Sequence, residues 1–124
     1  MKYRIQSIID KEILRCFDIG LTLTGIIDEL EKKSNRMMQN IDRDKMDLRP
    51  IFPALYNGAN VFDLPGVSTK LKYYYTYIKH TQKRIDDMKW IIINKKKFPL
   101  LSNSQIFKLL ELRDKLSKEN SLPF

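Results

Sequence analysis

Lysine and arginine carry the clearest chemical signal in this sequence, and they are concentrated in one segment. Residues 70–97 hold nine Lys/Arg against two acidic residues, which supplies +7 of the formal net charge of +8. Residues 1–69 balance ten basic against ten acidic side chains. A concentrated positive field favours binding of polyanions, because their association releases counterions. The segment therefore predicts an acidic partner, although charge alone does not separate DNA, RNA and acidic proteins.

The residue types that usually perform catalysis are scarce. His80 is the single histidine and Cys16 the single cysteine, so the chain lacks the ligands for a zinc site. Its four glycines are scattered and form no phosphate-binding loop. The acidic residues of 28–31 and 86–87 fit solvated helix faces. We therefore expect that the protein is not an enzyme and has no metal or cofactor.

The overall composition is that of one globular domain. The chain has 124 residues, of which 43% are hydrophobic and 31% charged. A lone cysteine suits a reducing compartment. The longest apolar run, 90–93, is too short to cross a membrane, and no apolar stretch follows the basic start. We expect a cytoplasmic protein with no membrane contact.

The N-terminal part of the chain predicts helices. Apolar residues from Ile5 to Phe17 recur every three or four positions, and Gly20 is placed to end that helix. Thr22 or Thr24 is expected to cap a second, short helix around residues 26–30. Residues 32–47 are polar and receive no firm assignment.

The middle of the chain predicts a short helix followed by two strands. Prolines in the first turn allow a helix from about Arg49 to Tyr56, although Asn57-Gly58 would also suit a hairpin turn. Residues 59–63 and the alternating tyrosine run 70–77 are expected to form the two strands. A long helix should then run to about Asn94. A last helix is expected over 102–119, capped by Ser102 or Ser104.

This order of elements is that of a winged helix-turn-helix, and three segments resemble PadR-type transcriptional regulators. They are Glu12–Glu31 with its glycine-terminated helix, Ile51-Phe52-Pro53-Ala54-Leu55, and Lys72-Tyr73-Tyr74. The resemblance implies a mostly α fold with a small two-stranded β wing (α+β), followed by long C-terminal helices. Residues 1–77 would bind DNA and residues 78–124 would form a helical dimerisation region of the same compact unit.

In this interpretation the protein is a homodimeric transcriptional regulator that binds specific sequences of double-stranded DNA. A recognition helix reads base edges, and wing residues contact the backbone. The expected DNA contacts are Arg49, Tyr56 and Asn57 on the helix, and Thr69, Lys70 and Lys72 on the wing. A second register remains open, in which residues 34–44 are the recognition helix. It would present Ser34, Asn35, Arg36, Gln39, Asn40 and Arg43.

The long helix is apolar on more than one side near Trp90, which predicts a covered surface. A dimer interface formed by Met88, Trp90, Ile91 and Ile92 is the simplest explanation. Proteins of the resembled family sometimes bind flat hydrophobic compounds beside an aromatic residue, so Trp90 is also a candidate contact for a small effector.

Two other functions remain open. The tyrosines at 73–77 would stack on single-stranded bases if they were exposed, although aromatic residues in a sheet more often pack beneath it. Alternatively, residues 67–94 form one continuous helix in an all-helical protein whose basic face docks an acidic protein partner. The seam of that helix would contain Leu71, Tyr74, Tyr75, Ile78, Ile85, Met88 and Ile92.

Overall fold

The described part of the protein consists of four α-helices and three short 3-10 turns. The computed structural model describes residues 2–51 and 60–120, and no residue within these ranges lies in a β-strand. The helices are α1 (Lys2–Asp18), α2 (Leu23–Arg43), α4 (Thr69–Asn94) and α5 (Asn103–Asn120). The 3-10 turns are Arg49–Ile51, Val61–Asp63 and Lys95–Lys97.

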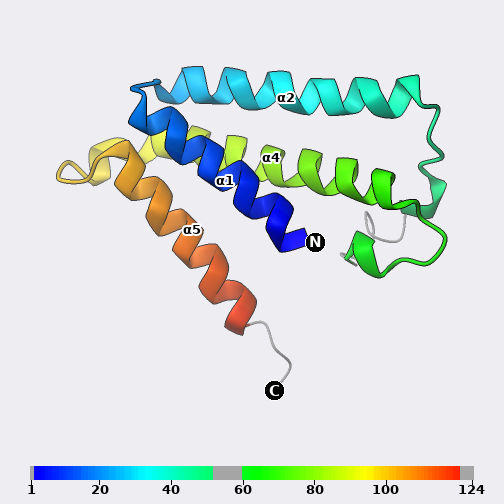
Figure 1. Cartoon of the computed structure of the whole chain (residues 1–124). Coiled ribbons are helices and arrows are strands. Elements are labelled where there is room, and N and C mark those ends of the chain that lie inside the picture. The colour runs from blue at the N-terminus through cyan, green and yellow to red at the C-terminus, as the bar shows by residue number, and fades with distance from the viewer. Residues whose placement is uncertain (1, 52–59, 121–124) are drawn as a thin grey trace.

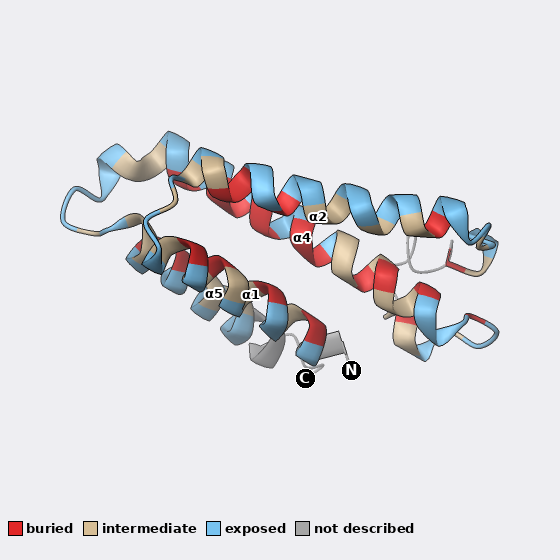
Figure 2. Cartoon of the chain, turned by 45° about the horizontal axis from the view of Figure 1, so that its top comes forward, coloured by how far each residue is buried: buried red, intermediate tan, exposed pale blue. Residues whose placement is uncertain are grey.

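Helix α4 is the central element of the fold. Helix α2 runs antiparallel beside it, while α1 and α5 pack together against its C-terminal half (Figures 1 and 2). The main core joins all four helices around buried side chains such as Ile13, Ile26, Met88 and Phe107. A smaller core closes the far end, where Ile41 of α2 meets Leu71 and Tyr74 of α4.

The start of the chain folds as its sequence predicts. The φ of Gly20 is +84°, and the amides of Gly20 and Leu21 donate to the carbonyls of Phe17 and Cys16. This pair of hydrogen bonds ends α1 in a Schellman motif. Thr22 then caps α2, because its Oγ1 accepts a hydrogen bond from the amide of Gly25 at 3.1 Å.

Helix α2 is longer than the short helix expected from the sequence. It contains no proline after Thr22, and Met37 and Ile41 continue the apolar stripe begun by Ile26 and Leu30. This apolar stripe packs against α4 along the whole length of α2. The packing keeps the polar residues that lie between the apolar ones in helical conformation. The alternative recognition segment 34–44 is therefore almost entirely the second half of α2, rather than a separate helix.

The predicted β wing is wrong. Residues 69–94 form one helix, and the first predicted strand is replaced by the 3-10 turn Val61–Asp63. Ser68 starts α4 by accepting a hydrogen bond from the amide of Leu71 on its Oγ at 3.1 Å. The fold of residues 2–51 and 60–120 is consequently helical without any strand, as the alternative interpretation expected. The domain boundary predicted at residue 77 falls in the middle of α4.

The tyrosine run is helical because its members pack at helical spacing. Leu71 and Tyr74 are buried in the smaller core, while Tyr73 and Tyr77, one turn apart, hold their rings 6.2 Å apart. The inward positions of α4 then continue at steps of three and four residues, through Ile78, Thr81, Ile85, Met88 and Ile91. Tertiary packing on this stripe overrides the strand preference of the aromatic residues.

The last helix begins at a capping box. The Oγ of Ser102 accepts a hydrogen bond from the amide of Gln105, and the side chain of Gln105 accepts one from the amide of Ser102. This arrangement confirms Ser102 as the cap of α5.

Candidate functional site

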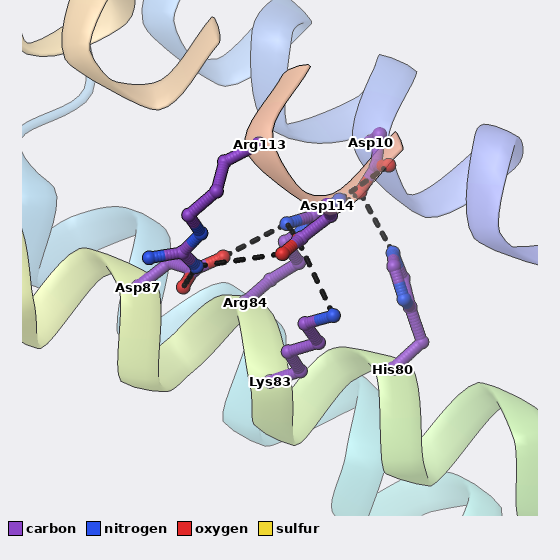
Figure 3. A network of polar contacts seen from close by, with 7 residues as sticks. All are labelled: Asp10, His80, Lys83, Arg84, Asp87, Arg113 and Asp114. Carbon is purple, nitrogen blue, oxygen red and sulfur yellow. Dashed lines mark hydrogen bonds and ion pairs between the residues drawn. The ribbon is translucent and has the colours of Figure 1, made fainter. Parts of the chain in front are cut away.

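The most concentrated polar chemistry of the described residues is a buried network between α1, α4 and α5 (Figure 3). At its centre lies Arg84 of α4, which is only 3% exposed. Its Nε and Nη2 donate to the two carboxylate oxygens of Asp10, at 2.7 and 3.0 Å. Its Nη1 donates to Asp87 at 2.8 Å and to Asp114 at 2.7 Å. One guanidinium therefore joins three helices.

Asp10 also contacts the only histidine of the chain. The Nε2 of His80 lies 2.8 Å from Oδ1 of Asp10. Burial acts to raise the pKa of Asp10, but hydrogen bonds from His80 and Arg84 outweigh it and lower that pKa below its usual range. Asp10 is therefore a carboxylate at neutral pH.

Asp114 connects this centre to the surface. Burial acts to raise its pKa, but the hydrogen bond from Arg84 and the charge of Lys83 lower it below the usual value. The Nζ of Lys83 lies 3.3 Å from its carboxylate. On the other side, Arg113 lies 3.7 Å from Asp87. The three carboxylates thus face three fixed cations.

This network has the character of a structural clamp. Its charges are compensated, and the guanidinium of Arg84 also lies 5.6 Å from the ring centre of Phe107 in the core. Three of the four hydrogen bonds from Arg84 to carboxylates cross from α4 to α1 or α5, and the fourth, to Asp87, lies within α4. A buried, fully paired arginine fixes the relative position of helices. No group of His, Cys, Asp and Glu in the described part of the chain could hold a metal ion.

Sequence reasoning missed this network. It treated Asp86 and Asp87 together as a solvated helix face, whereas Asp87 is buried and Asp86 is exposed. The signal that could have found it is the spacing of His80, Arg84 and Asp87, which share a face of α4. Three polar residues on the side of a helix that also carries core residues indicate buried pairing.

The predicted DNA contacts do not lie on a common wing. Thr69, Lys70 and Lys72 are in the first turn of α4, where Lys70 pairs with Asp44 at 2.8 Å. The Nζ of Lys72 donates to the carbonyl of Phe62. Arg49 is exposed and paired with Asp47, while Tyr56 and Asn57 lie outside the described residues.

The predicted dimer residues divide between the core and the surface. Met88 and Ile91 are fully buried within the single chain, so they present no surface to a second copy. Trp90 and Ile92 are exposed. The ring of Trp90 lies against that of Phe98, with ring centres 6.2 Å apart.

A mixed apolar and basic surface surrounds Trp90. We define the corner surface as eight residues at the end of α4 and in the turn that follows, all of them exposed except the half-buried Lys95. Its apolar members are Trp90, Ile93, Phe98 and Leu100, and its basic members are Lys89, Lys95, Lys96 and Lys97.

The corner surface is unusual in its exposure and in its charge. Ile93 is 77% and Leu100 is 94% exposed, which is high for such large apolar side chains. Among the described residues, none of the four lysines has an acidic partner within ion-pair distance. Lys95 instead donates to the carbonyl of Phe98. The surface therefore combines available apolar area with available positive charge.

No family model matches the chain, and neither curated proteins nor solved structures give a significant match. The resemblance to PadR-type regulators therefore gains no support and stays a prediction. Of the segments behind it, Lys72–Tyr74 is helical, and residues 52–55 are outside the described part. No described helix is long and apolar enough to cross a membrane.

Proposed function

We propose that this chain is a basic, all-helical interaction protein that binds an acidic partner protein through the corner surface. The observation that carries this proposal is the exposure of Trp90, Ile93, Phe98 and Leu100 beside four lysines that have no acidic partner in the described part of the chain. Protein interfaces have this anatomy, with an apolar centre and a polar rim. Tryptophan is among the residues that contribute most to such interfaces.

The apolar members favour a protein over a nucleic acid. Phosphate contacts need only the lysines, and a duplex offers little apolar surface for Ile93 and Leu100 to bury. An acidic protein satisfies both parts of the corner surface. Duplex DNA binding was predicted from the winged helix-turn-helix order of elements and the PadR-type resemblance, and its mechanism required the wing that the described residues lack.

The homodimer, the hydrophobic effector and the absence of catalysis remain predictions from the sequence. A homodimer would now have to use Trp90 and Ile92 without Met88 and Ile91. A hydrophobic effector near Trp90 would have to displace or join Phe98. The absence of catalysis is likewise still an expectation from the scarcity of catalytic residue types.

Co-purification from nuclease-treated extract of the source cells tests the proposal. The test variant carries Lys89→Gln, Lys96→Gln and Lys97→Gln. The matched control carries Lys11→Gln, Lys32→Gln and Arg36→Gln, which remove the same charge from exposed positions on α1 and α2.

We expect an acidic protein to co-purify with the unchanged chain and with the control. Loss of three rim cations should weaken its binding roughly tenfold, because each contributes a fraction of a kcal/mol to about 1 kcal/mol. Failure of any protein to co-purify would contradict the proposal. Proteins that co-purify only when the nuclease treatment is omitted would favour a nucleic-acid binder instead.

A further inference from the structure

Helix α5 carries two apolar faces, and only one of them is used by the fold. Ile106, Phe107 and Leu110 are buried in the main core. On the opposite face the leucines are about half exposed, with 52%, 49% and 47% of their surface accessible for Leu109, Leu112 and Leu116 respectively. We call these three residues the α5 seam.

The leucines of the α5 seam have the spacing of the a and d positions of a coiled coil. They are three and four residues apart, as these positions of a heptad are. In this register Lys108 and Lys115 occupy g positions, and Arg113 occupies the e position between them. All three flanking side chains are exposed and basic, and Arg113 also lies 3.7 Å from Asp87 and 3.4 Å from Asp114.

The acidic residues of α5 lie elsewhere. Asp114 turns inward to Arg84, and Glu111 is half-buried, where burial and the charge of Asp10 raise its pKa. Within residues 103–116, the charged side chains beside the seam are therefore all cations. This asymmetry determines which helix can cover it.

A second copy of α5 would fit the leucines but oppose like charges. In an antiparallel pair, g positions face g positions, which would bring Lys108 near Lys115 of the other copy. In a parallel pair, g faces e, which would bring Lys108 near Arg113. Basic flanks therefore disfavour self-association and favour a helix with acidic flanks.

We propose that the α5 seam binds an amphipathic helix whose apolar stripe is flanked by glutamate or aspartate. The inference rests on the proposed function, because it assigns a second surface to the same acidic class of partner. A leucine stripe one residue wide suits a helix better than a membrane, which requires a broad apolar face.

A synthetic helix tests this inference without the natural partner. The probe is a peptide of about three heptads with leucine at a and d and glutamate at e and g. A second peptide replaces the glutamates by lysines. Each is titrated into isotopically labelled full-length protein, and amide chemical shifts report where it binds.

We expect the glutamate peptide to shift resonances of α5 and to bind at least about tenfold more tightly than the lysine peptide. Leu112→Gln with Leu116→Gln should abolish these shifts. The control Ile8→Gln with Met38→Gln, at similarly exposed apolar positions, should retain them. Circular dichroism establishes that both variants fold.

Several outcomes would overturn the inference. They are equal binding of the two peptides, absence of binding, shifts confined to the corner surface, or a dimer of the unchanged chain that Leu112→Gln dissociates. Preferential binding of α5 to anionic vesicles would assign the seam to a membrane instead. Because the peptide assay does not involve the corner lysines, it can fail while the co-purification succeeds, and the reverse.

Discussion

At the scale of single residues, Thr81 is a weak point of the core. It is fully buried on α4, and its hydroxyl has no hydrogen-bond partner among the described residues. Thr81→Val keeps the branched shape while removing a buried, unsatisfied polar group. We expect it to raise the free energy of unfolding by about 1 kcal/mol, measured by urea denaturation. Destabilisation by the same amount would show that the hydroxyl has a partner.

Arg84 should be among the least replaceable residues. Arg84→Ala would leave Asp10, Asp87 and Asp114 without their shared cation, and we expect a loss of about 3–5 kcal/mol. Lys83→Ala is the matched comparison, because Lys83 also pairs with Asp114 but is half exposed, and it should cost less than about 1 kcal/mol. Equal costs in urea denaturation would contradict a central role for Arg84.

Glu111 should oppose folding at neutral pH. Burial and the charge of Asp10 raise the pKa of Glu111 in the folded protein. The folded state therefore favours the protonated side chain, and the contribution of Glu111 to the stability of the fold is present at acidic pH and lost as pH rises through the folded pKa. Asp10 and Asp114 behave in the opposite way, because their pKa values are lowered in the folded protein. Their ionised carboxylates stabilise the fold at neutral pH, and this stabilisation is lost when they are protonated in acid.

The prediction for Glu111→Gln follows from these directions. The variant should be more stable than the unchanged chain at pH 7, and the gain should shrink as pH falls through the raised folded pKa and be largely gone by about pH 4.3, the usual pKa of glutamate. Thermal unfolding across this pH range measures the difference. A gain that is the same at pH 7 and in acid would show that ionisation of Glu111 is not its cause.

At the scale of elements, the ends of helices were more predictable than their extents. Gly20, Thr22 and Ser102 act locally through backbone hydrogen bonds, so their roles are visible in a few neighbouring residues. The conformation of Leu71–Tyr77 depends instead on packing against α2, which is distant in sequence. The alternating tyrosines therefore indicated a strand, while the apolar seam from Leu71 to Ile92 was compatible with the continuous helix that forms.

At the scale of the whole molecule, the charge pattern predicted an acidic partner but not the surface that would meet it. Lys70 and Lys83 belong to the basic segment, yet both pair with aspartates from other elements. Only the fold distinguishes these paired cations from Lys89 and the lysines of 95–97. The clamp around Arg84 was equally hidden, because its carboxylates come from three helices.

Trp90 should dominate the corner surface if a partner binds there. Trp90→Ala would remove a large aromatic anchor, and we expect at least about a 30-fold loss of affinity for the acidic partner, corresponding to about 2 kcal/mol. Co-purification yield and a direct titration against the recovered partner measure it. Ile8→Ala, on an exposed apolar residue of α1, serves as the control. An unchanged affinity for the Trp90 variant would place the interface elsewhere.

The continuity of α4 is the claim on which both proposed surfaces depend, because this helix positions the corner surface and the packing of α5. Cα secondary chemical shifts of residues 69–94, measured by NMR on the full chain, test it directly. The fold predicts helical values without interruption from Thr69 to Asn94. Extended values over Leu71–Tyr77 would contradict it and would restore the winged arrangement.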